Sequence, residues 1–65
     1  MEDFSSIVIT RRKKLGMTQR DLAKISGVSK THICAIENGS NPSWNTVVKI
    51  LQALGFKVVI ENLEE

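Results

Sequence analysis

The stretch TQRDLAKISGVSKTHICAIENG, residues 18–39, decides the fold of this 65-residue chain. Thr18 and Ser29 are favoured N-cap residues, and Gly27 and Gly39 stand where a short helix beginning after each cap would end. Apolar residues recur between these signals at helical spacing: Leu22 and Ile25 in the first half, Ile33 and Ile36 in the second. The stretch therefore predicts two short helices joined by a tight turn.

The residues before this stretch predict one more helix. It spans about residues 5–15, with Ser5 or Ser6 as the N-cap and Gly16 as the stop signal. Three apolar residues lie near one of its faces, namely Phe4, Val8 and Leu15. The β-branched run over residues 7–10 weakens the prediction, because such residues lose side-chain freedom in a helix.

The residues after the stretch predict a helix and then a strand. Ser43 is an N-cap candidate after Pro42, and residues 44–54 carry the clearest amphipathic helical pattern. Beyond Gly55 the period changes to two, which predicts a strand over roughly residues 56–62. The apolar residues of this strand are Phe56, Val58, Val59 and Ile60.

A lone strand leaves its backbone groups unpaired, and no other segment looks like a strand. We therefore expect the strand to pair with its copy in a homodimer, with these four apolar residues at the interface. The alternative is an apolar tail folded back onto the helices. The expected fold is all-α, with four to five short helices. Residues 1–55 are expected to form the domain, and residues 56–65 a dimerisation strand with an acidic end.

Composition limits the classes of function. A chain of 65 residues suits one small domain, and its single cysteine excludes an intrachain disulfide. No apolar run is long enough to span a membrane, so we expect a cytoplasmic protein. Residues 1–57 hold all nine Lys and Arg residues against four acids, a net charge of +5, which suits a polyanionic partner or simply a solvated surface. No catalytic set, cofactor motif or metal-ligand cluster is visible, so we do not expect an enzyme.

The two predicted helices and their turn have the outline of a helix-turn-helix. Ala23 is small where the helices would cross, and Val28 follows the turn glycine. With RRKKLG before it and NPSWNTVVKILQALG after it, the stretch resembles the Xre-type helix-turn-helix family, which includes phage repressor and Cro proteins. The resemblance covers residues 4–55, and the predicted strand is similar to extensions by which some members dimerise.

The resemblance implies roles for individual residues. Gln19 matches a glutamine that contacts a phosphate, unless it is merely an exposed polar residue. Arg12 and Glu37 match a pair that often forms an internal salt bridge, although Arg12 also suits a phosphate contact. The positions that face the major groove are Ser29, Lys30, Thr31 and Ala35. The loop that donates to a phosphate is matched by Asn38 with the Gly39–Ser40 backbone beyond it. His32 is expected to contact a phosphate, unless it sits in solvent at the side of the helix. Further phosphate contacts are expected from Arg11, Lys13, Lys14, Arg20, Ser40 and Ser43.

The resemblance also implies the function: a DNA-binding transcriptional regulator, expected to be a repressor that binds a palindromic operator as a homodimer. The alternative is an antitoxin that binds a toxin protein and represses its own operon. Lys30 can bind guanine acceptors, whereas Ala35 offers only apolar contact, which suits a thymine methyl. We therefore expect DNA shape to contribute much of the specificity. Trp44 is expected to pack over its loop, and Cys34 to be a small surface residue.

Overall fold

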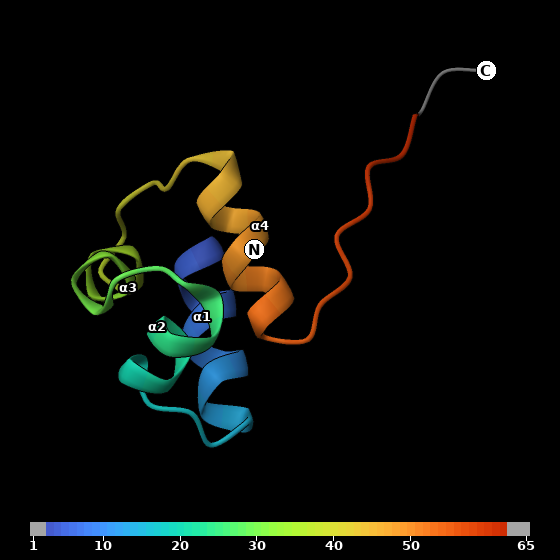
Figure 1. The fold of residues 1–65 in the computed structure, drawn as a ribbon. Coiled ribbons are helices and arrows are strands. Elements are labelled where there is room, and N and C mark those ends of the chain that lie inside the picture. Colours follow the sequence, from blue (N-terminus) through green and yellow to red (C-terminus); the bar gives the residue numbers. More distant parts are fainter. Residues whose placement is uncertain (1–2, 63–65) are drawn as a thin grey trace.

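The computed structural model describes residues 3–62 and contains four helices in that range (Figure 1). They are α1 (Phe4–Lys14), α2 (Gln19–Ser26), α3 (Lys30–Glu37) and α4 (Trp44–Ala53). Helix α2 packs against α3 and α4, and α1 packs against α3. The all-α prediction is confirmed. No helix among the described residues is long and apolar enough to cross a membrane.

The core is built from residues of every helix. Its buried members are Val8, Leu22, Val28, Ile33, Ile36, Ile50 and Leu54. Two apolar residues predicted on inward faces are exposed instead. Leu15 is 45% exposed because it follows the last helical residue and caps α1. Ile25 is 62% exposed because the inner side of α2 runs through Leu22, Ala23 and Ser26.

A side-chain oxygen caps the N-terminus of each helix. The caps predicted at Thr18, Ser29 and Ser43 are confirmed. The prediction for α1 is wrong, because Asp3 caps this helix and its Oδ1 accepts from the Ser6 amide at 2.9 Å. Ser5 has another partner: its hydroxyl donates to the Glu37 carbonyl at 2.7 Å. The first turn of α1 is thereby joined to the last residue of α3.

The strand predicted over residues 56–62 does not form within one chain. Residues 56–62 are extended and carry no regular secondary structure, and they lead away from the helices (Figure 1). A strand requires a second strand to pair with, and the described part of one chain offers none. The alternative, a tail folded onto the helices, is not seen beyond its base either: Val59 is 62% and Ile60 81% exposed. We call residues 57–62 the tail.

Replacing the α2 cap tests the basis of this helix. Thr18 Oγ1 accepts from the Asp21 amide at 3.0 Å, and the Asp21 carboxylate accepts from the Thr18 amide at 2.9 Å. We expect Thr18→Ala to lower the free energy of unfolding by about 1 kcal/mol, measured by urea denaturation. Thr10→Ala, an exposed change inside α1, is the control and should stay within about 0.5 kcal/mol of wild type. Equal losses in both variants would contradict a capping role.

Candidate nucleic-acid interface

Helix α3 is held on the core by one side, which leaves the other side outward. Ile33 and Ile36 are fully buried, and Val28 in the preceding turn is 7% exposed. Ser29 begins the helix, and its Oγ accepts from the His32 amide at 3.1 Å. The turn itself requires Gly27, whose φ of +77° is a left-handed conformation that other residues rarely adopt. These residues fix which side chains α3 presents to solvent.

The outward side of α3 begins with three exposed polar residues. Lys30, Thr31 and His32 are exposed, and their side chains make no hydrogen bond within the described part of the chain. Ala35, one turn further along, is half-buried, and so is Cys34. A cation, a hydroxyl and an imidazole thus lie at the N-terminal end of α3 without a hydrogen bond to the described chain. This combination can hydrogen-bond to base edges or phosphates.

The carboxylate of Glu37, at the end of α3, gathers side chains from two other helices. Arg12 of α1 donates through Nε to Oε2 at 2.7 Å and through Nη2 to Oε1 at 2.9 Å. Gln19 of α2 donates through Nε2 to Oε1 at 3.0 Å. The Arg12 and Glu37 side chains are 11% and 7% exposed, so this is a largely buried bidentate pair. The expected internal salt bridge is therefore present.

The protonation of this cluster is strongly biased. Burial by itself would raise the pKa of Glu37, but hydrogen bonds from Arg12 and Gln19 outweigh burial, and the pKa lies below its ordinary 4.5. The hydrogen bonds to Glu37 raise the pKa of Arg12, against the opposing effect of burial. Both groups are therefore charged at neutral pH, and the position of α3 relative to α1 and α2 depends on that charge.

Gln19 was expected to contact a phosphate, and the structure gives it an internal partner that the sequence did not suggest. Its amide nitrogen is oriented by Glu37, which leaves one N–H bond and the amide oxygen of Gln19 for other partners. Ser5 was missed in the same way, because its bond to the Glu37 carbonyl joins residues 32 positions apart. No local pattern reports such contacts.

The loop after α3 uses many of its polar groups internally. The Asn38 side chain donates to the Cys34 carbonyl at 2.9 Å. The amides of Gly39 and Ser40, which were expected to face a phosphate, donate to the Ile36 and Ala35 carbonyls at 3.0 Å each. They are occupied because they end α3, where the last carbonyls need donors. The exposed Ser40 hydroxyl remains available.

Five further expected phosphate contacts, and Trp44, lie in different surroundings. Ser43 Oγ caps α4 and lies 3.1 Å from Thr46 Oγ1. Arg11 donates to the Leu54 carbonyl at 3.0 Å, and with Lys14 it lines a hollow of about 220 Å³ beside Phe56. Arg11 and Lys14 thus belong to the base of the tail. Arg20 and Lys13 are exposed. Trp44 is 57% exposed, so it does not pack over its loop as expected.

Comparisons with known proteins agree with this arrangement. A family model described as helix-turn-helix matches residues 8–59. An uncharacterized HTH-type transcriptional regulator of Haemophilus influenzae is 43% identical over 49 residues, which are 74% of this chain. The chain spans about half the length of that relative. No group of three or more potential metal ligands occurs among residues 3–62.

Removing the cation of the buried pair should strongly destabilise the fold. In Arg12→Ala the Glu37 carboxylate stays largely buried without its partner, which costs about 3 kcal/mol. We expect a loss of that size in the free energy of unfolding, measured by urea denaturation. The neighbouring Lys13→Ala, a change at an exposed residue, should alter it by less than about 0.5 kcal/mol. Similar values for the two variants would show that the pair contributes little.

The same pair predicts a dependence of stability on pH. Because the folded state lowers the pKa of Glu37, its stabilisation is present above about pH 4.5 and is lost as the pH falls through the folded-state pKa. Glu37→Gln should therefore be less stable than wild type at pH 7, and the difference should shrink below pH 4. Asp3 and Asp21 also have lowered pKa values, but both residues are present in wild type and in Glu37→Gln, so their effect cancels in the difference. A difference that is constant from pH 7 to pH 3 would contradict the assignment to Glu37.

Proposed function

Because the chain belongs to the Xre-type helix-turn-helix family, we propose that it is a transcriptional regulator that binds specific DNA sequences through α3. The observation that carries the proposal is the exposed first turn of α3. The side chains of Lys30, Thr31 and His32 have no hydrogen-bond partner among residues 3–62, whereas the rest of the helix is fixed by the core and by the bonds to Glu37. The helix backbone is held in place while these side chains lack hydrogen bonds, so they are available to a partner outside the chain.

Within the proposed interface, Ser29, Lys30, Thr31 and Ala35 are assigned to base edges. Lys30 suits the acceptors of guanine, and the methyl groups of Thr31 and Ala35 suit a thymine methyl. Ser29 contributes less than its position suggests, because its hydroxyl already accepts a hydrogen bond as the cap of α3. So short a list of base contacts supports a regulator that depends partly on DNA shape and on the spacing of two half-sites.

The proposed phosphate contacts fall into three groups. Arg20, His32 and the Ser40 hydroxyl are exposed and have no competing hydrogen bond in the described chain, which favours them. Gln19, Asn38 and Ser43 already hold internal hydrogen bonds and would contribute their remaining groups. Arg11 and Lys14 are the weakest members of the set, because they border the tail.

We further propose that the regulator acts as a homodimer and represses transcription from a palindromic operator. Residues 1–55 would form the DNA-binding unit and residues 56–65 the dimerising segment. Two copies of α3, related by a two-fold axis, would enter successive major grooves about 34 Å apart. The exposed apolar side chains of the tail support a protein partner, and a second copy matches the symmetry that a palindrome requires. Repression would then follow from blocking the promoter.

The antitoxin alternative uses the same surface, since a toxin could bind the exposed apolar tail instead of a second copy. Co-expression with a neighbouring gene product tests it. A stable complex with that product, in which the tail is protected from proteolysis, would favour the antitoxin. A chain that forms only a homodimer, and does not bind the neighbouring gene product, would favour the simple regulator.

Selection of duplexes from a random library, followed by titration of variants, tests the DNA-binding proposal. We expect one palindromic site, and a loss of about ten-fold or more in affinity for it in Lys30→Ala, with relaxed preference at one base pair of each half-site. Lys49→Ala removes the same charge from an exposed position of α4 and should change affinity by less than about three-fold. Equal effects of the two substitutions, or no enriched duplex at all, would refute base recognition by α3.

A further inference from the structure

The base of the tail is held by α1 and by the end of α4. Gly55 has a φ of +85°, which turns the chain out of α4. The Phe56 amide donates to the Leu51 carbonyl at 2.9 Å, and the Arg11 guanidinium lies 5.1 Å from the centre of the Phe56 ring. Arg11 also donates to the Leu54 carbonyl at 3.0 Å, so one side chain contacts both the residue that follows α4 and Phe56 at the base of the tail. The tail therefore leaves the body in a defined direction.

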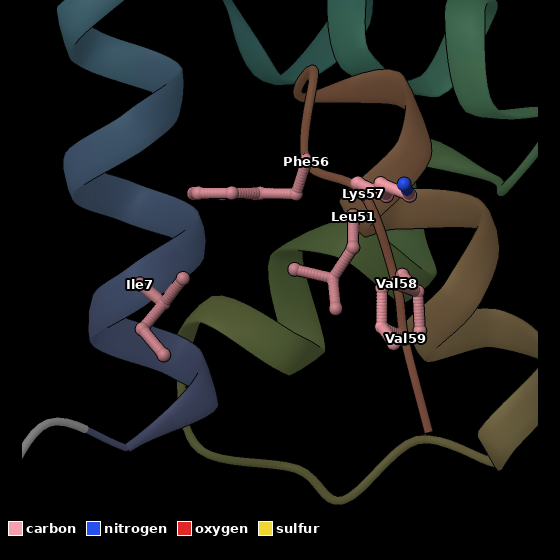
Figure 2. Close-up of a pocket in the computed structure, with 6 residues that line it drawn as sticks. All are labelled: Ile7, Leu51, Phe56, Lys57, Val58 and Val59. Carbon is pink, nitrogen blue, oxygen red and sulfur yellow. The ribbon is translucent and has the colours of Figure 1, made fainter. Parts of the chain in front are cut away.

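Beyond this base, the backbone groups of residues 57–61 have no hydrogen-bond partner within the described chain. Their apolar side chains become more exposed outward, from half-buried Val58 to Val59 at 62% and Ile60 at 81%. A hollow of about 330 Å³ lies between α1 and the tail. It is lined by the six residues drawn in Figure 2, namely Ile7, Leu51, Phe56, Lys57, Val58 and Val59. The tail forms one wall of this hollow, so it cannot also fill it.

The order of charges along the tail points to the partner. Lys57 stands two residues before Val59, and Glu61 stands two residues after it. If an antiparallel copy is aligned so that the two Val59 residues face each other, Lys57 of each copy lies opposite Glu61 of the other. The tail is therefore complementary in charge to an antiparallel copy of itself.

Symmetry restricts how two such tails can pair. In an antiparallel ladder, residues directly opposite each other point to the same face of the sheet. A two-fold axis perpendicular to the sheet leaves each residue on the same face of the sheet in both copies. Two residues that lie opposite each other must therefore be separated by an even number of positions in the sequence. The axis must therefore pass beside one residue that faces its own copy. Val58, Val59 and Ile60 are the central candidates.

We propose that the tails of two copies pair as antiparallel strands with the two-fold axis at Val59. This inference rests on the homodimer of the proposed function and specifies its register. Lys57 then faces the partner's Glu61, and Glu61 faces the partner's Lys57. Val58 faces the partner's Ile60, which brings the most exposed apolar side chain of each copy next to the hollow beside Val58 of the other.

The neighbouring registers lose these pairs. An axis at Val58 places Lys57 opposite the partner's Val59, and an axis at Ile60 places Glu61 opposite the partner's Val59. Either one leaves a charge facing an apolar side chain and separates the opposite charges. Cross-strand pairs of opposite charge stabilise a ladder and like charges destabilise it, so the Val59 register is favoured.

A set of single cysteines locates the axis. In a Cys34→Ser background, which removes the native thiol, cysteine is introduced singly at Val58, Val59 and Ile60, and disulfide-linked dimers are followed during mild oxidation. Only the residue on the axis faces itself within about 5.5 Å, a separation that a disulfide can bridge. We expect Val59→Cys to link at least ten-fold faster than the other two. Faster linking at Val58 or Ile60 would overturn the register.

A charge exchange tests the pairing of Lys57 with Glu61. The dimer dissociation constant is measured by sedimentation without DNA. Lys57→Glu and Glu61→Lys should each raise it about ten-fold, because each creates two like-charge pairs, and the double variant should return to within about three-fold of wild type. Lys49→Glu makes the same charge change outside the tail and should have little effect. A double variant as weak as the singles together would refute the pairing.

These measurements separate the two proposals. A wild-type dimer that binds the selected operator but links fastest at another position refutes only the register. A chain that is monomeric at micromolar concentration and still binds DNA refutes pairing through the tail and the homodimer. Loss of DNA selectivity in a chain whose tails link at Val59 refutes the regulator while leaving the register correct.

Discussion

The bidentate pair between Arg12 and Glu37 is the constraint on which the rest of the structure depends. Glu37 is the last residue of α3, and its carboxylate receives donors from α1 and, through Gln19, from α2. Its carbonyl receives a fourth hydrogen bond, from Ser5 at the start of α1. One end of α3 is thus held to both preceding helices. Small changes in these bonds would tilt the helix whose other end faces outward.

The need for such a cluster follows from the size of the domain. Its buried core is confined to a few aliphatic residues, and there is no disulfide to support it. Aliphatic contacts fill space but do not define the angle between short helices sharply, because similar packings differ little in energy. A largely buried guanidinium and carboxylate have strict geometry, since a misplaced charge in that site would lose its partners. We infer that the apolar core gives this fold its stability, and the polar cluster its precise helix arrangement.

Much of this fold was predictable from the sequence, and the exceptions have physical causes. Thr18, Ser29 and Ser43 correctly predicted the starts of three helices, because an N-cap depends only on residues close in sequence. The cap of α1 was predicted wrongly because Asp3, Ser5 and Ser6 each carry an oxygen that can accept from a helix amide, so the local sequence does not distinguish them. The strand predicted over residues 56–62 is absent from the single chain, where this segment is extended but unpaired. Its expected pairing with a second copy depends on a partner that one chain lacks, so that pairing stays a prediction. Contacts to Glu37 from residues far apart in sequence, and the use of Arg11 at the tail, depend on three-dimensional packing alone.

The outward side chains at the start of α3 have one more consequence. Since the side chains of Lys30, Thr31 and His32 form no hydrogen bond within the described chain, substitutions there remove no side-chain hydrogen bond from the fold. The surface that would meet DNA can therefore diverge after gene duplication without first requiring compensating changes in the core. The fold therefore places little constraint on which side chains occupy this turn, and the choice of residues there is left to whatever partner the turn binds.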